Sequence, residues 1–183
     1  TLIAALNAES ISDIIVTSDD PDILSNQNIK NGCKFVIERP SQLALDNTPA
    51  TVYIEHALKT VDAINNFQYF CILQPTSPLR LASDIDSLYR QVLKLKTPAG
   101  VTVIDLPHNC LPNSLMQTDG TFVWPTSDTR FGLNLRQKKE GLVARNGAAV
   151  YICEVEYFMK FKTLFSEKMA FWKMPFMRSV DID

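Results

Sequence analysis

Short apolar runs rich in β-branched residues alternate along the chain with longer segments whose apolar residues recur every three or four positions. The short runs predict strands over residues 13–18, 33–37, 69–73, 100–104, 148–153 and 169–174. The longer segments predict helices over residues 1–8, 21–31, 51–65, 84–95 and 154–161. Because these strands are almost wholly apolar and alternate with helices, we expect an α/β fold of three layers. Its sheet would be mostly parallel, with helices on both faces.

The alternation stops between about residues 106 and 147, where prolines and polar residues are frequent. Asp119-Gly120 lies between two short extended segments, 114–117 and 121–124, which predicts a hairpin. The following residues, 127–147, are polar and rich in lysine and arginine. An excursion of roughly forty residues is long for a plain loop. We therefore expect one domain, residues 1–183, with an inserted arm at about 106–147 that serves as a subunit contact or a lid.

The composition excludes several classes of protein. With 183 residues, 46% of them hydrophobic, the chain is long enough to bury a core. Its net charge of −2 argues against a nucleic-acid binder, and no apolar run has the roughly 18 residues needed to span a membrane. No secretion signal is recognisable, and the four cysteines lack a Cys-x-x-Cys pair. We expect a cytoplasmic protein whose cysteines are core residues.

Four polar segments follow predicted strands, where ligands bind in open α/β sheets: residues 17–20, 39–40, 74–80 and 181–183. Asp181 and Asp183 alternate around Ile182, so on an extended backbone both carboxylates face one side. Two such carboxylates can hold Mg²⁺ together with substrate phosphate oxygens. The spacing is equally compatible with an exposed strand end that carries two solvated acids.

The segment 74–80 offers an amide, two hydroxyls and a guanidinium, from Gln74, Thr76, Ser77 and Arg80. These groups suit a polyhydroxylated or carboxylated ligand, although a rigid proline-rich turn that caps the next helix would use the same residues. Arg39 is a candidate phosphate ligand or a solvated surface residue.

Five segments, in order and over nearly the whole chain, together resemble the acylneuraminate cytidylyltransferases. They are Ile15-Val-Thr-Ser-Asp-Asp20, Arg39-Pro-Ser-Gln-Leu-Ala-Leu-Asp46 with Thr48-Pro49, Leu73-Gln-Pro-Thr-Ser-Pro-Leu-Arg80, Arg145-Asn-Gly-Ala-Ala-Val-Tyr-Ile152 and Ser179-Val-Asp-Ile-Asp183. The third and fifth segments are specific as a pair.

The resemblance implies a Rossmann-like nucleotidyltransferase sheet with an inserted dimerisation arm, and therefore a homodimer. It implies transfer of CMP from CTP to the anomeric hydroxyl of a nonulosonic acid, with Mg²⁺ as cofactor. Asp181 and Asp183 inherit the catalytic, metal-binding role. The nucleotide would contact Arg39, Asp46 and Thr48. The sugar acid would contact Gln74, Thr76, Ser77, Arg136, Tyr151 and Phe165, with Arg136 at its carboxylate.

Two alternatives stay open: a related CTP-dependent enzyme of the 3-deoxy-manno-octulosonate type, and a non-catalytic α/β binding or oligomerisation module. The family's N-terminal Arg-x-Gly-Ser-Lys loop does not occur in the sequence. Since such glycine-rich loops hold phosphates, we expect this chain alone to be most of one domain and to bind triphosphate poorly. The identity of the nonulosonic acid is also open among neuraminic, legionaminic and pseudaminic acids.

Overall fold

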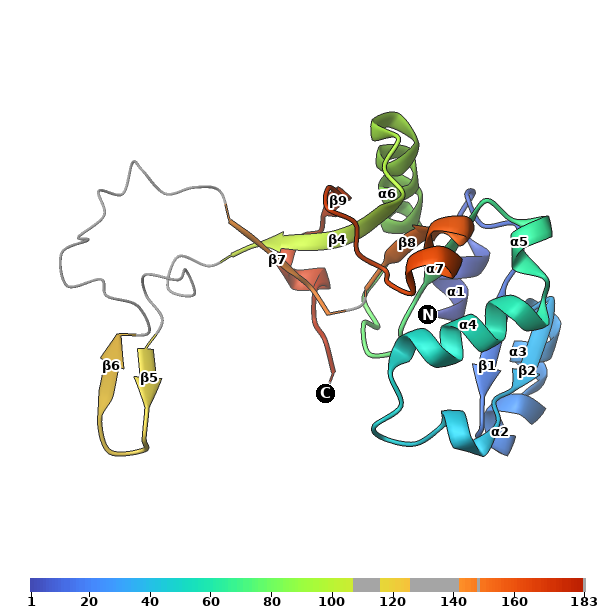
Figure 1. Ribbon diagram of the computed structural model, residues 1–183, viewed down its shortest axis with the longest axis horizontal. Coiled ribbons are helices and arrows are strands. Elements are labelled where there is room, and N and C mark those ends of the chain that lie inside the picture. The colour runs from blue at the N-terminus through green and yellow to red at the C-terminus, as the bar shows by residue number, and fades with distance from the viewer. Residues whose placement is uncertain (107–115, 126–141, 148, 183) are drawn as a thin grey trace.

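The structure, a computed structural model, describes residues 1–106, 116–125, 142–147 and 149–182 (Figure 1). Within these residues, β1 (Ile15–Ser18) and β2 (Phe35–Glu38) form a parallel pair. A five-stranded sheet has the order β3-β8-β4-β7, with β9 also paired to β4. Its strands are β3 (Tyr69–Ile72), β4 (Ala99–Asp105), β7 (Val143–Arg145), β8 (Tyr151–Glu154) and β9 (Ala170–Lys173).

The strands β3, β4 and β9 share one direction, because β3 and β4 both pair antiparallel with β8 and β9 is parallel to β4. The strands β7 and β8 run the other way and follow one another along β4. Val103 pairs with Arg145 and Val101 with Tyr151, so the chain between Arg145 and Tyr151 leaves the ladder opposite Thr102. This interruption places Asn146 and Gly147 at the edge of a candidate site.

Helices cover both faces of the sheets, which confirms the predicted three-layer α/β fold (Figure 1). The helices are α1 (Leu2–Leu6), α2 (Pro21–Ser25), α3 (Gln27–Gly32), α4 (Ala50–Thr60), α5 (Ala63–Asn66), α6 (Ala82–Leu95) and α7 (Val155–Phe161), with 3₁₀ turns η1 (Ser41–Leu43) and η5 (Phe176–Arg178).

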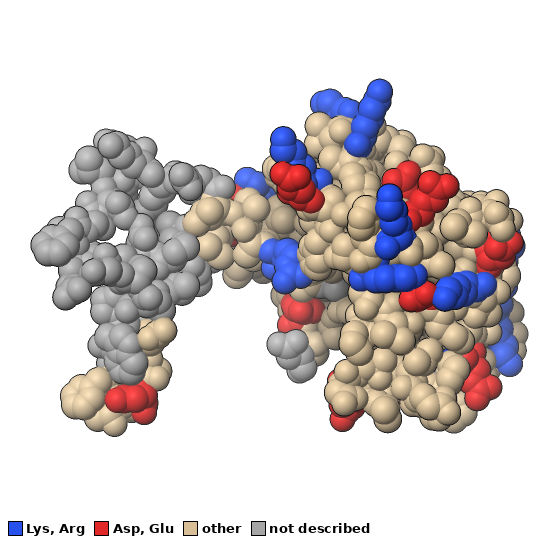
Figure 2. All heavy atoms as spheres, viewed as in Figure 1, with Lys and Arg blue, Asp and Glu red and all other residues tan. Residues whose placement is uncertain are grey.

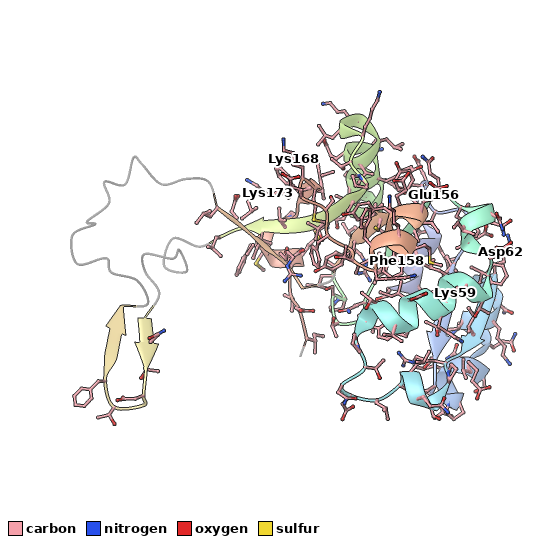
Figure 3. All side chains as sticks on the ribbon, in the orientation of Figure 1. Lys59, Asp62, Glu156, Phe158, Lys168 and Lys173 are labelled. Carbon is pink, nitrogen blue, oxygen red and sulfur yellow. The ribbon has the colours of Figure 1, made fainter. Side chains whose placement is uncertain are left out.

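Two apolar clusters fill the space between the layers. On one face, α4 and α7 pack over β1, β2 and β8, with Phe158 on α7 (Figure 3). The buried ring of Phe158 lies edge-on to that of Phe70, with ring centroids 5.3 Å apart. On the other face, α6 packs its residues Ile85, Leu88 and Val92 against β8 and β9. Since neighbouring residues of a strand point to opposite faces, one strand serves both clusters.

Two predicted helices are interrupted, so those predictions were wrong in detail. Residues 21–31 form α2 and α3, because the Asn26 side chain accepts the backbone N–H groups of Asn28 and Ile29 and begins a second helix. Residues 51–65 form α4 and α5, separated at Asp62, whose φ of 50° is left-handed. The helix expected from residue 84 begins at Ala82. Local polar groups thus end helices whose apolar spacing continues.

The predicted hairpin is confirmed as β5 (Met116–Thr118) paired antiparallel with β6 (Val123–Pro125). In its turn, the Asp119 carboxylate accepts the backbone N–H groups of Thr121 and Phe122 at 2.9 and 2.8 Å. The end of the predicted arm was wrong, because residues 143–145 form β7 and pair with β4 in the central sheet. Residues 107–115 and 126–141 of the arm lie outside the described residues. Its role in dimerisation stays a prediction.

Acidic and basic side chains are interspersed over the face shown in Figure 2, as the small net charge leads one to expect. Within the described residues, no helix combines the length and the apolar character that crossing a bilayer requires.

Candidate active site

A cleft of about 520 Å³ lies where several of the predicted site segments meet. Its walls come from α4, the end of β3, the β7–β8 connection, the segment after α7 and the segment after η5. The lining residues are Ala50, Tyr53, Ile54, Ile72, Gln74, Arg145, Gly147, Tyr151, Leu164, Phe165 and Asp181. Of the predicted sugar-acid and metal residues, Gln74, Tyr151, Phe165 and Asp181 therefore share one cleft.

A second cleft, of about 410 Å³, lies between the loop after α5 and the start of α7. It contains Asn65, Gln68, Glu154 and Glu156 but none of the predicted site residues. We therefore describe the first cleft as the candidate active site.

Asp181 lies against the backbone of Gly147. A Cβ on Gly147 would come within 2.8 Å of the Asp181 Oδ1 atom and closer still to Oδ2, so the absence of a side chain makes room for this carboxylate. The Ser77 hydroxyl, in a side chain only 1% exposed, donates to Asp181 Oδ1 at 3.5 Å. The next residue, Ile182, donates its backbone N–H to the Thr76 carbonyl at 2.8 Å. The segments around Thr76 and Asp181 are thus brought together, as predicted.

The metal site can be tested only in part. Asp183 lies outside the described residues. Among the residues that are described, no group of three or more histidine, cysteine, aspartate or glutamate side chains could hold an ion. Mg²⁺ is usually bound through one or two carboxylates, with waters and substrate phosphates completing its shell. One carboxylate facing a cleft beside the Ser77 hydroxyl fits that requirement.

Arg145 is a cleft residue to which the sequence motifs assign no role. Its Nη1 atom donates to the Tyr151 hydroxyl at 3.0 Å, and Tyr151 donates in turn to the Gly147 carbonyl at 3.1 Å. The guanidinium also stacks on Phe165, 5.0 Å from the ring centroid, and Phe165 meets Tyr151 edge-on at 5.9 Å. Tyr151 and Phe165 therefore orient this cation at the cleft.

Arg39 reaches the cleft indirectly. Its Nη2 atom pairs with Asp19 Oδ1 at 2.5 Å, and its guanidinium lies 5.1 Å from the ring of Tyr53, a cleft residue. The hydrogen bond from Arg39 lowers the pKa of the Asp19 carboxyl. Its neighbour Asp20 caps α2 by accepting the Asp22 N–H at 2.8 Å, as expected for a helix start. The Asp19–Arg39 ion pair therefore joins the residues that follow β1 and β2, beside the cleft.

The other predicted nucleotide residues, Asp46 and Thr48, lie between η1 and α4. Asp46 is exposed, Thr48 is half-buried, and neither belongs to the cleft lining. Arg136 lies outside the described residues.

Arg80, which the sequence offered as a ligand-binding guanidinium, is used inside the protein. It is 3% exposed and donates to the carbonyls of Ala149 and Gln74 and to the Thr1 hydroxyl. Burial lowers the pKa of this guanidinium. Arg80 therefore supports the wall of the cleft from behind, which agrees with the alternative in which the polar groups of this turn serve the protein itself.

No model of a known protein family matches the chain. Among curated proteins, the chain is similar to an N-acylneuraminate cytidylyltransferase from Escherichia coli, with 32% identity over 110 residues. The match covers 58% of this chain, and this chain spans about a quarter of the length of that relative.

Among solved structures, the fold resembles that of a CMP:2-keto-3-deoxy-manno-octonic acid synthetase complexed with CTP. The TM-score is 0.63 at 12% identity, over 94% of this chain and 76% of the other. The structural likeness shows that the chain shares the fold of that synthetase. The sequence likeness confirms the resemblance to the acylneuraminate cytidylyltransferases that the motifs indicate.

Proposed function

We propose that this chain forms the sugar-acid side of a cytidylyltransferase, which transfers CMP from CTP to the anomeric hydroxyl of a nonulosonic acid and releases pyrophosphate. The observation that carries the proposal is one cleft that joins a carboxylate, a guanidinium and an amide, from Asp181, Arg145 and Gln74. Its volume lies in the range of small-molecule sites. The similar curated protein, an N-acylneuraminate cytidylyltransferase, supports this choice of reaction.

The sugar acid brings a carboxylate and several hydroxyls to the cleft. Arg145, oriented by Tyr151 and Phe165, would bind the carboxylate together with Arg136, whose role the family resemblance implies. Gln74, Thr76 and Ser77 would bind hydroxyl groups through their amide and hydroxyl side chains. Tyr151 and Phe165 would also pack against the apolar parts of the sugar.

The nucleotide would lie toward Arg39, with Asp46 and Thr48 on the loop before α4. Displacement at the α-phosphorus requires alignment and charge neutralisation more than covalent catalysis. Asp181 and Asp183 would hold Mg²⁺, which supplies that neutralisation when it is bound. Gly147 and Ser77 fix the carboxylate of Asp181 at the cleft edge.

We further propose a homodimer formed through residues 106–147, within one nucleotidyltransferase domain spanning residues 1–183, and a cytoplasmic location. The free thiols of Cys33, Cys71 and Cys153 support a reducing compartment.

Pyrophosphate release tests the proposed reaction directly. The full-length protein is incubated with CTP, Mg²⁺ and one sugar acid at a time, chosen from neuraminic, legionaminic, pseudaminic and 3-deoxy-manno-octulosonic acids. We expect turnover with a nonulosonic acid. Turnover with the octulosonic acid alone would favour the second candidate, which the structural neighbour supports. Absence of turnover with every acid would favour a non-catalytic module.

Substitutions distinguish a role of the two carboxylates in turnover from a role in stabilising the fold. Asp181→Ala and Asp183→Ala should each abolish Mg²⁺-dependent turnover while leaving thermal unfolding nearly unchanged. Asp105→Ala is the matched control, because it removes an exposed acid that pairs with Lys173 at 2.6 Å. Arg136→Ala should raise the KM for the sugar acid more than the KM for CTP. Unchanged rates in both Asp181→Ala and Asp183→Ala would contradict the metal assignment.

A further inference from the structure

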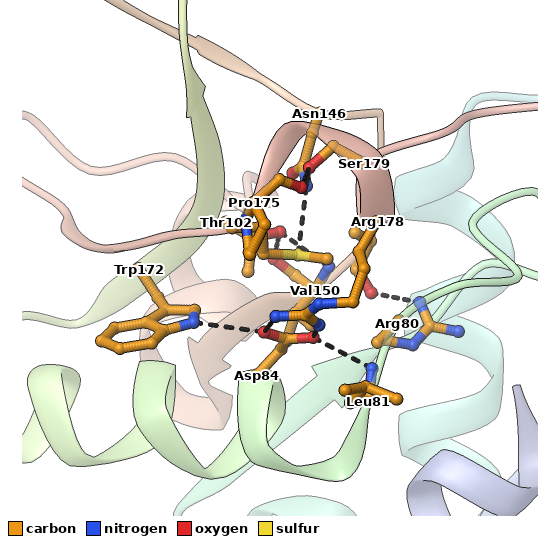
Figure 4. Close-up of polar contacts among 12 residues, drawn as sticks. Arg80, Leu81, Asp84, Thr102, Asn146, Val150, Trp172, Pro175, Arg178 and Ser179 are labelled. Atoms are coloured by element: carbon orange, nitrogen blue, oxygen red, sulfur yellow. Dashed lines mark hydrogen bonds and ion pairs between the residues drawn. The ribbon is translucent and has the colours of Figure 1, made fainter.

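An ion pair between the buried Asp84 and Arg178, whose side chain is 27% exposed, joins the first turn of α6 to the segment that carries Asp181. The Asp84 carboxylate is only 1% exposed, and both of its oxygens accept hydrogen bonds from Arg178 in η5, with Nη2 and Oδ1 3.0 Å apart (Figure 4). The Leu81 N–H donates to Oδ2 at 2.9 Å, and the Trp172 Nε1–H donates to Oδ1 at 3.3 Å. Asp84 is therefore a fully paired anion that holds Arg178 in a fixed, bidentate geometry.

A second contact fixes the next residue of the same segment. Asn146, which is 3% exposed, donates through Nδ2 to the Ser179 hydroxyl at 3.1 Å, and Ser179 donates to the Pro175 carbonyl at 3.0 Å (Figure 4). Asn146 directly precedes Gly147, which receives the Asp181 carboxylate. The Asn146–Ser179 hydrogen bond thus joins the two segments that meet at Gly147 and Asp181, one residue before Gly147 and two residues before Asp181.

These ties matter because residues 179–182 form neither helix nor strand. A segment without regular backbone hydrogen bonds takes its position from the contacts at its ends. Here the contacts are Arg178 and Ser179 on one side of Asp181, and the Ile182 N–H to the Thr76 carbonyl on the other.

Stability alone does not account for an ion pair with a buried carboxylate at this place. Removing two charges from water offsets much of their attraction, so replacing such a pair by uncharged groups is often nearly neutral. What a bidentate pair adds is a defined position for the two segments it joins.

We propose that Asp84 and Arg178 are positioning residues: their ion pair, with the Asn146–Ser179 hydrogen bond, holds Asp181 at the cleft in the place where it binds a divalent cation. The inference rests on the proposed function of Asp181 and goes beyond it by naming the residues that act through Asp181. They do not touch the substrate or the cation themselves.

The test compares two variants for metal binding and for stability. Arg178→Gln leaves Asp84 buried without its cation and should lower the melting temperature. The double variant Asp84→Asn/Arg178→Gln removes both charges and should recover most of that loss. Both should raise the Mg²⁺ concentration for half-maximal turnover at least about tenfold, and weaken calorimetric binding of Mn²⁺ alone by a similar factor. A merely structural pair would change the melting temperature without changing either metal response.

Lys173→Gln is the matched control, since it breaks another ion pair, with Asp105, that joins β9 to β4 away from Asp181. It should leave both metal responses unchanged. A folded double variant with the parent's Mg²⁺ dependence and Mn²⁺ affinity would overturn the inference and leave the proposed function intact. A parent protein that neither binds Mn²⁺ nor turns over CTP would overturn both.

Discussion

The contact between Gly147 and Asp181 allows a sharp test of how the site is built. With a φ of +66°, Gly147 has a left-handed backbone that costs another residue about 1–2 kcal/mol. An alanine Cβ would also lie 2.8 Å from Asp181 Oδ1 and nearer to Oδ2, whereas an ordinary contact begins at 3.4 Å. The carboxylate must therefore move by more than about 0.5 Å, and displacements on the order of 1 Å can lower a rate about 100-fold.

We expect Gly147→Ala to lower the melting temperature by about 2–8 °C, because 1 kcal/mol corresponds to about 2–4 °C in a protein of this size. Mg²⁺-dependent pyrophosphate release should fall about 100-fold. Gly120→Ala is the matched control: Gly120 also has a positive φ, of +92°, but a Cβ there meets nothing within 4 Å. It should leave turnover unchanged. If Gly147→Ala keeps the parent's rate and Mg²⁺ dependence, the contact with Gly147 does not position Asp181.

Three further predictions follow from contacts and burial. Arg145→Ala removes a charge-assisted hydrogen bond of about 1.5–3 kcal/mol, so the KM for the sugar acid should rise at least about tenfold while the KM for CTP stays constant; an equal rise in both would contradict its role. Phe158→Ala removes a fully buried ring and should cost about 3–5 kcal/mol, measured by urea unfolding; a loss below about 1 kcal/mol would contradict its place in the core. Burial raises the pKa of Cys71 and of Cys153 to about 12, so their thiolates are scarce at pH 8 and reactivity increases only as pH rises toward that value. In a Cys110→Ser background, a thiol reagent followed by mass spectrometry should modify the buried Cys153 only after unfolding, and its rapid modification in the native protein would refute that burial.

Most strands were predictable because buried strands are continuous apolar runs, as at β4. The strand β7 was not, because it is largely exposed and follows a polar, basic segment. The ends of the helices were not, because Asn26 and Asp62 interrupt apolar patterns that continue past them. Single polar residues of this kind are also common inside intact helices, so their effect becomes visible only in the folded backbone.

For the site, the sequence correctly brought Gln74, Tyr151 and Asp181 to one cleft, since their segments follow strands or border them. It assigned no role to Arg145, because its position depends on the break between β7 and β8 opposite Thr102. It left both uses of Arg80 open, since nothing in the motif indicates that this guanidinium turns inward toward Ala149.

The contacts that complete the cleft join residues far apart along the chain: 104 positions separate Ser77 from Asp181. Closing so long a loop has an entropic cost that only the assembled sheet can offset. During translation, Gln74 and Tyr151 are both synthesised before Asp181, so the residue that completes the cleft is added last. A nascent chain would expose an incomplete pocket, and ligand binding would report that synthesis has passed Asp181 and that the sheet beneath it has assembled.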